Sequence, residues 1–250
     1  MESRVSTDEF DERVGKIAAL ADPIRRALYR YVVGQPDPVG RTQAADAVGV
    51  AHHAAKFHLD KLEADGLLDV EYSRPPGRSG PGAGRPAKRY RRSSKEVAVS
   101  LPERRYGLAG RVMAEAIATA AKSDVAITQT LRDAAATAGR ALGEQAREQA
   151  GNRAGRAATV RVVGDVLAEC GYEPRLDGGA IILANCPFHA LAENYTELVC
   201  GMNLDLLDGL VKACDRSGLR AEFNPEPDRC CVTLGSLPMA DARSARRGRR

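Results

Sequence analysis

The sequence predicts an α+β fold in three parts: amino-terminal helices that end in a β-hairpin, a central helical region, and a small α+β region that carries the cysteines. Apolar residues recur at helical spacing through the first third of the 250-residue chain. A segment rich in Pro, Gly and Arg separates two runs with strand character. All six cysteines lie in the last third, at Cys170, Cys186, Cys200, Cys214, Cys230 and Cys231.

Composition shifts divide the chain, and its length is enough for two modest domains. We expect a first domain over residues 1–100 and a helical dimerisation or linker region over residues 101–156, which ends in the linker GNRAG. A second domain follows over residues 157–239. Residues 240–250 are basic, low in complexity and expected to be a disordered tail.

Capping residues divide the first third into short helices. Asp22 precedes Pro23, which is the order of an N-cap and a first helical residue. Thr42 is a candidate N-cap for a shorter helix. Gly49 would form the bend after that helix, and Gly66 would end the last helix. We therefore expect helices over residues 8–20, 23–33, 42–48 and 51–65.

A short helix, a glycine turn and a longer helix in succession form the helix-turn-helix pattern. Strands are expected over residues 67–72 and 88–92, and the long tip between them makes this hairpin a wing. In the longer helix three apolar residues should pack inward, and five residues should project on the other side. The inward residues are Ala55, Leu59 and Leu62, and the outward ones are His52, His53, Lys56, Phe57 and Asp60.

Charge is distributed unevenly, and this points to a nucleic acid. Residues 72–95 hold eight bases and no acid, whereas residues 160–239 hold twelve acids and six bases. The outward start of the longer helix would enter the major groove, and Arg85 an AT-rich minor groove. The expected DNA contacts are His52, His53, Lys56, Phe57, Arg74, Arg78, Arg85, Lys88, Arg89 and Arg91. The alternatives are an ordinary solvated helix face and a chromatin protein that binds without sequence preference.

Two runs carry a resemblance to a known family. They are LADPIRRAL at residues 20–28 and VAHHAAKFHLDKLEADGLL at residues 50–68. These runs resemble the ArsR/DeoR-type winged-helix regulators of bacteria, over roughly residues 10–95. The resemblance implies a homodimer that reads an inverted-repeat, palindromic operator in double-stranded DNA.

The rest of the chain alternates helices and short strands. Residues 102–148 are Ala-rich and helical, with one apolar face that runs from Leu108 to Ala121 and needs a partner. That partner is a second copy of the helix, or the chain's own last domain. Further helices are expected near residues 157–170, 190–198 and 203–217, and strands near residues 172–176, 180–185, 220–223 and 230–234.

The cysteine spacing argues against a zinc finger, because no tight C-x2-C pair is present. Thiolates that are far apart in sequence can still converge on an iron–sulfur cluster. We assign Cys170 to a buried apolar face of a helix. For the other cysteines, the alternative to metal binding is burial as small hydrophobic residues. Adjacent Cys230 and Cys231 argue against that alternative, since successive strand residues face opposite ways.

The segments NCPFHALA, LVCGM and CCV are similar to the carboxy-terminal region of SufR-type regulators, which bind an iron–sulfur cluster. The resemblance implies a cluster, of the 4Fe–4S type, held by Cys186, Cys200, Cys214 and Cys230, with Cys231 as the alternative to Cys230. The spacings depart from that family's pattern, and this leaves Cys214 in doubt, with His189 as another fourth ligand.

These observations predict a cytoplasmic regulator, most simply a repressor, whose operator binding is gated by the cluster. Zinc or a thiol–disulfide switch would serve as other sensors, and a small-ligand or enzymatic domain is a further alternative. We expect no enzyme, because no phosphate loop, nucleophile elbow or HExxH pair is present. No apolar run approaches the ~20 residues that cross a bilayer, and the first ten residues do not form a secretory signal.

Overall fold

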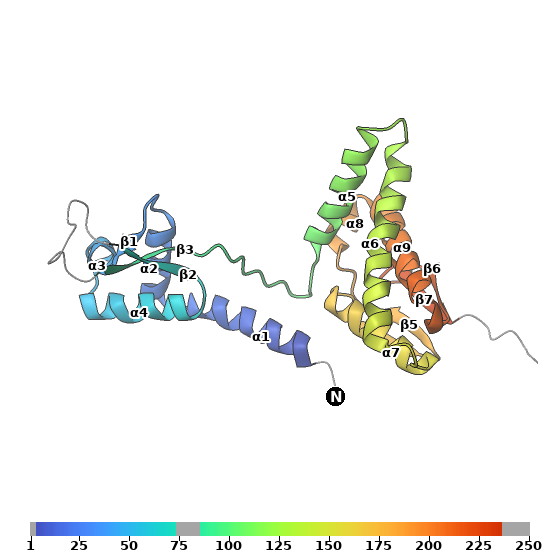
Figure 1. The fold of residues 1–250 in the computed structure, drawn as a ribbon, viewed down its shortest axis with the longest axis horizontal. Helices are drawn as coiled ribbons and strands as arrows, with labels where there is room; N and C mark the ends of the chain where they lie inside the picture. The colour runs from blue at the N-terminus through green and yellow to red at the C-terminus, as the bar shows by residue number, and fades with distance from the viewer. Residues whose placement is uncertain (1–3, 74–85, 237–250) are drawn as a thin grey trace, which may run out of the picture. The chain divides into compact units, whose positions relative to one another are not determined.

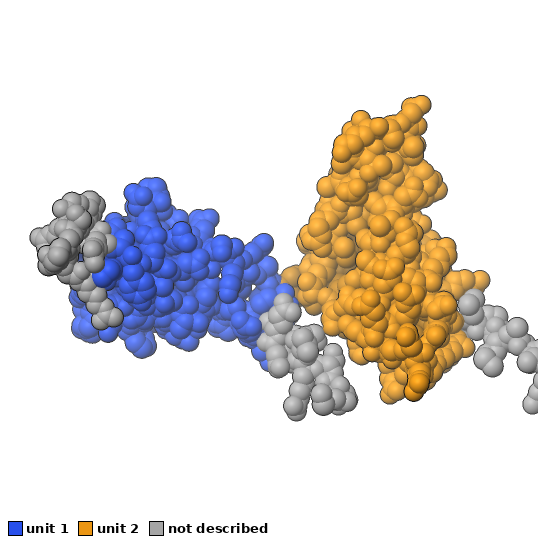
Figure 2. Space-filling view, viewed as in Figure 1, with its two compact units in different colours: residues 1–99 blue, residues 100–250 orange. Residues whose placement is uncertain are grey.

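The computed structural model describes residues 4–73 and 86–236. The chain forms two compact units, which meet in sequence between Val99 and Ser100 and are coloured separately in Figure 2. Each unit has its own hydrophobic core. The tail expected over residues 240–250 lies outside the described residues.

The first unit is a helix-turn-helix followed by a wing (Figure 1). Its helices are α1 (Arg4–Ala19), α2 (Pro23–Val33), α3 (Arg41–Val48) and α4 (His52–Ala64). Strands β1 (Val39–Gly40), β2 (Leu68–Ser73) and β3 (Ala87–Arg92) form an antiparallel sheet in the order β1-β3-β2.

Local sequence explains where these helices begin and end. Asp22 Oδ1 accepts a hydrogen bond from the Arg25 backbone N–H at 2.8 Å, which confirms the predicted cap of α2. Gly49 and Gly66 have φ angles of 72° and 71°, a conformation that glycine adopts without strain. The prediction for Thr42 was wrong, because the N-cap of α3 is Gly40 and no side chain caps it.

The second unit packs helices against a four-stranded sheet. The helices are α5 (Tyr106–Ala120), α6 (Ile127–Ala150), α7 (Arg156–Glu169), α8 (His189–Asn194) and α9 (Thr196–Ala213), followed by a 3₁₀ turn (Asp215–Ser217). The strands are β4 (Pro174–Asp177), β5 (Ala180–Leu183), β6 (Leu219–Phe223) and β7 (Val232–Ser236). The sheet order is β4-β5-β7-β6, and every neighbouring pair is antiparallel.

The Ala-rich region is two helices and not one, because the chain turns between Ala120 and Ile127. Helices α5 and α6 belong to the second unit, where α6 lies along α9 (Figure 1). The segment GNRAG is the turn between α6 and α7 inside that unit. Part of the apolar face of α5 is therefore covered within the chain, with Ala109, Val112 and Ala116 buried in the core, whereas Ile117 on the same face is 56% exposed.

Candidate nucleic-acid interface and four-cysteine site

Helix α4 divides into a buried face and an exposed face, as its spacing predicts. Ala55, Leu59 and Leu62 are fully buried in the core of the first unit. The four outward residues that we expected to contact DNA are exposed, and they are His52, His53, Lys56 and Phe57. Phe57 is 65% exposed although it is a large aromatic side chain. An uncovered ring of this kind is consistent with a surface that contacts a partner.

A recess of about 660 Å³ lies beside the start of α4, between α3 and the wing strands. His52 lines it, and its Nε2 lies 2.6 Å from the hydroxyl of Thr42. Gln43 and the exposed ring of Tyr72 line the same recess. Thr42, Gln43 and Tyr72 are not among the contacts that the sequence predicts. Thr42 was predicted only as a cap, and the exposed polar residues of α3 are a signal that could have found Thr42 and Gln43, but not Tyr72 on β2.

Asp60 does not point outward, which corrects the sequence prediction. Its carboxylate accepts hydrogen bonds from Tyr90 Oη at 2.6 Å, Arg41 Nη2 at 2.9 Å and Lys88 Nζ at 2.9 Å. Burial alone would raise the pKa of Asp60, but these three hydrogen bonds outweigh it and lower the pKa to about 2. Burial, together with the bond to Asp60, raises the pKa of Tyr90 to about 12.

The expected wing contacts fall into three groups. Lys88 is engaged inside the fold, where its ammonium group contacts both Asp60 and Glu63. Arg89 donates a hydrogen bond to the Pro38 carbonyl oxygen at 3.1 Å, and Arg91 is exposed. The remaining predicted contacts lie outside the described residues, and they are Arg74, Arg78 and Arg85.

Four cysteines of the second unit come together, and we refer to them as the four-cysteine site: Cys186, Cys200, Cys230 and Cys231. Cys186 follows β5, Cys200 lies on α9, and the adjacent pair precedes β7. In three pairs the thiols lie close enough for one to shift the pKa of the other: Cys186 with Cys230, Cys230 with Cys231, and Cys231 with Cys200. The pairing of β5 with β7 brings the first and last of these segments together, and the Cys230 backbone N–H donates to the Leu183 carbonyl at 2.9 Å.

Cys214 is not part of this site. It caps the carboxyl end of α9, fourteen residues beyond Cys200, so about 21 Å of helix separates the two. Its charged neighbours are Asp215 and Arg147, not the other thiols. His189, the other candidate fourth ligand, is 58% exposed and pairs with Glu193 at 3.3 Å.

Three thiols of the site, those of Cys186, Cys200 and Cys230, have a raised pKa. The hydrogen bond to Cys230, followed by burial, raises the pKa of Cys186 far above its ordinary value. The bond from Cys186 lowers the pKa of Cys230, but the bond to Cys231 and burial outweigh it and bring that pKa to about 11. Burial likewise raises the pKa of Cys200, and that of Cys170 to about 11.

A buried polar pair that was not predicted from the sequence, Asn203 and Tyr172, lies beside Cys230. Asn203 Nδ2 donates a hydrogen bond to Cys230 Sγ at 3.2 Å, and the Tyr172 hydroxyl donates to Asn203 Oδ1. All three side chains are at most 1% exposed. The sulfur of Cys230 is therefore oriented as a hydrogen-bond acceptor, which is the role that a ligating sulfur also plays.

Four thiol sulfurs are a donor set that thiophilic ions and iron–sulfur clusters require. Over residues 4–73 and 86–236, however, no three His, Cys, Asp or Glu side chains already stand in metal-site geometry. The donor chemistry of the site fits such a group, and ligation would require the thiols to turn and lose their protons.

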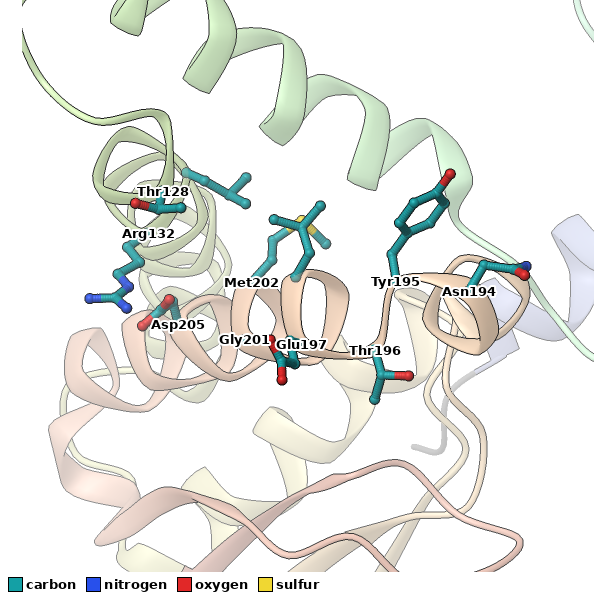
Figure 3. A pocket seen from close by; sticks show the side chains of 11 residues that line it. Thr128, Arg132, Asn194, Tyr195, Thr196, Glu197, Gly201, Met202 and Asp205 are labelled. Atoms are coloured by element: carbon teal, nitrogen blue, oxygen red, sulfur yellow. The ribbon is translucent and has the colours of Figure 1, made fainter.

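A second recess, of about 600 Å³, lies between α6 and the start of α9 (Figure 3). Arg132 and Asp205 lie close together at one end of it, and Tyr195 lies toward the other. Burial raises the pKa of Asp205. Met202, two residues after Cys200, forms part of the wall.

Comparison with known proteins identifies one segment. Residues 20–71 match a family model described as a helix-turn-helix domain, which spans α2 to β2. No curated protein and no solved structure matches the chain. The match confirms the helix-turn-helix part of the predicted resemblance and gives no support for the SufR-like part. None of the described helices is long and apolar enough to cross a membrane.

Proposed function

We propose that this chain is a transcriptional regulator that binds a palindromic operator as a homodimer, and that its four-cysteine site gates that binding. One observation carries the DNA-binding half: a helix-turn-helix segment whose second helix exposes His52, His53, Lys56 and Phe57 on one face. The acid-free segment at residues 72–95 supplies the phosphate contacts.

Salt dependence tests the DNA contacts. Each Lys or Arg that neutralises a phosphate adds close to one to the slope of log affinity against log salt concentration. Lys56→Gln and Arg91→Gln should each lower that slope by about one. Arg140→Gln removes the same charge from exposed α6 and should change nothing. An unchanged slope in both variants would contradict the proposed interface.

Footprinting tests sequence preference and the dimer together. A winged-helix homodimer should protect two half-sites about one helical turn apart, related by a dyad. Uniform retardation of any duplex would instead indicate a protein that binds without sequence preference. Light scattering of the free protein measures the dimer directly.

The sensor that we propose is a 4Fe–4S cluster held by Cys186, Cys200, Cys230 and Cys231, with zinc as the alternative occupant. This set replaces Cys214 with Cys231, because Cys214 lies at the far end of α9. When bound, a cluster would supply sensitivity to oxidants and to iron supply. The chain's own residues would hold it between the end of β5, the start of α9 and the start of β7.

Metal analysis after anaerobic purification tests the sensor. We expect iron with acid-labile sulfide and a visible absorption band, or zinc in a colourless protein. Ser substitution at Cys186, Cys200 or Cys230 should remove the bound metal, whereas Cys170→Ser and Cys214→Ser should retain it. A protein that binds neither metal, or that loses it equally in the two control variants, would contradict the proposed site.

A further inference from the structure

The loop that carries Cys186 is fastened to the chain segment that joins the two units. Residues 103–105 lead from the first unit into α5, and they lie against the loop at residues 185–187. We call this set of contacts the clamp. It lies entirely within the second unit.

Hydrogen bonds of both side chains and backbone make the clamp. Arg104 Nη1 donates to Asn185 Oδ1 and to the Cys186 carbonyl oxygen, the latter at 3.1 Å. Asn185 Nδ2 donates to the Glu103 carbonyl at 2.9 Å, and the Arg105 N–H donates to the Pro187 carbonyl at 3.0 Å. Three consecutive residues of the segment are therefore fixed by three consecutive residues of the loop.

The clamp is set into the core side of the unit and is not a loose surface contact. Asn185 is 7% exposed, and its Nδ2 also donates to the Gly171 carbonyl at 2.6 Å. Pro187 is buried as well. Arg105 is fastened further by Glu103, at 2.8 Å, and by the Glu169 carbonyl. Moving Cys186 without moving residues 103–105 would break several part-buried hydrogen bonds, each of which costs free energy to leave unmade.

The other end of the joining segment is fixed to the first unit. Ser93 Oγ donates to Asp69 Oδ1 at 3.2 Å, and the Ser94 N–H donates to Asp69 Oδ2 at 3.3 Å. Val97 packs against the core of the winged-helix unit. Only residues 98–102 remain between the two attachments, and five residues reach at most about 18 Å. A displacement at Glu103 therefore enters a segment of only five residues before the first unit.

We propose that the clamp transmits the state of Cys186 to the winged-helix unit. A change at this cysteine, such as metal ligation, shifts its backbone, and the bonds of Arg104, Asn185 and Arg105 carry that shift into the short tether. The inference rests on the proposed function, since it assigns the route by which the four-cysteine site reaches the DNA-binding surface. Coupling of this kind needs two sites and an element that both of them bias.

Amide hydrogen exchange tests the clamp without DNA. The protein is compared in chelator with reductant, with Zn²⁺ alone, and with ferrous iron and sulfide, all under anaerobic conditions. We expect exchange over residues 98–105 to differ at least about fivefold between the chelated and a metal-bound sample. Arg104→Met should abolish the difference while metal still binds. Arg111→Met, an equal charge loss on the exposed side of α5, should keep it.

A perturbation that needs no metal keeps the two proposals separable. Cys186→Met places a longer side chain in the loop and should alter exchange over residues 98–105, whereas Cys214→Met should not. If the wild-type protein binds no metal but Cys186→Met has this effect, the sensor proposal fails and the clamp stands. If Cys186→Met has no effect, or if Arg104→Met keeps the metal-dependent difference, the clamp is overturned.

DNA affinity then tests transmission. The probe is a duplex selected by the wild-type protein from a random pool. The affinity of the protein for this duplex should differ at least about fivefold between the metal-bound and the chelated protein. In Arg104→Met the ratio of these two affinities should fall to about one. A wild-type ratio of one contradicts gating, and an unchanged ratio in Arg104→Met overturns transmission through the clamp.

Discussion

At the scale of single residues, Asp60 joins three elements of the winged-helix unit. It lies on α4 and accepts hydrogen bonds from Arg41 on α3 and from Lys88 and Tyr90 on β3. The carboxylate thus fixes the wing strand against the helix that enters the proposed interface. This arrangement couples the position of the wing to the charge of one side chain.

The low pKa of Asp60 makes the stability of this unit depend on acid. Because folding lowers that pKa to about 2, the charged form contributes stability above its ordinary value near 4. That contribution should be lost as the pH falls from about 4 to about 2. Asp60→Asn should cost about 1 kcal/mol at neutral pH, a modest figure because the side chain is 35% exposed. The same substitution should also make the free energy of unfolding depend less on pH between about 4 and about 2.

Amide hydrogen exchange in the full chain, recorded over this pH range, measures the free energy of opening of α4 and β3. Asp46→Asn provides the control, since Asp46 is an exposed carboxylate on α3. An acid profile that is the same in wild type and in Asp60→Asn would show that Asp60 does not set it.

Helical spacing was enough to predict the outward residues but not to place Asp60. Asp60 follows Lys56 by four residues, so spacing alone puts both on the same side of α4. Its partners lie 28 and 30 residues away on β3, and those contacts decide where the carboxylate lies. The same contacts place Lys88 inside the fold, a result that the charge count of the wing could not give.

At the scale of elements, α6 and α9 approach so closely that no side chain fits between them. A Cβ atom added to Gly139 would lie 1.8 Å from the Leu206 carbonyl oxygen. One added to Gly209 would lie 2.3 Å from that of Ala136. Both obstacles are backbone atoms, which cannot turn aside as the end of a flexible side chain can.

Gly139→Ala should therefore destabilise the second unit by roughly 3 kcal/mol or more, because the two helices must separate. Gly110→Ala is the matched control: it lies in α5 with nothing within 4 Å of its added Cβ. Alanine there should stabilise the helix by about 0.5–1 kcal/mol. Urea unfolding of each variant measures the difference. Equal effects of the two substitutions would refute the tight helix contact.

Most element bounds were predictable because they depend on local chemistry. Asp22 with Pro23 sets the start of α2, and Gly49 and Gly66 end helices at positive φ. The role of the Ala-rich helices was not predictable in the same way. A stripe of small residues fits against any close neighbour, and the sequence does not say whether that neighbour is a second copy or α9.

At the scale of the whole molecule, the two units have separate cores, and charge is distributed unevenly along the chain. The contrast between the acid-free segment at residues 72–95 and the acidic segment at residues 160–239 could be read directly from the sequence. The convergence of the cysteines could not be, because it depends on sheet order. Strand β7 pairs with β5, and this places Cys230 and Cys231 beside Cys186 although more than forty residues separate them.

Separate cores predict separate unfolding. No buried residue is shared between the core around Leu59 in the first unit and the core around Leu206 in the second. Calorimetry of the full chain should therefore resolve two transitions. Asp60→Asn should lower only the transition of the first unit, and Gly139→Ala only that of the second. The assignment is checked by amide exchange in α4 and in α9 at intermediate temperatures. A single transition that both substitutions lower together would mean that the two units unfold as one body.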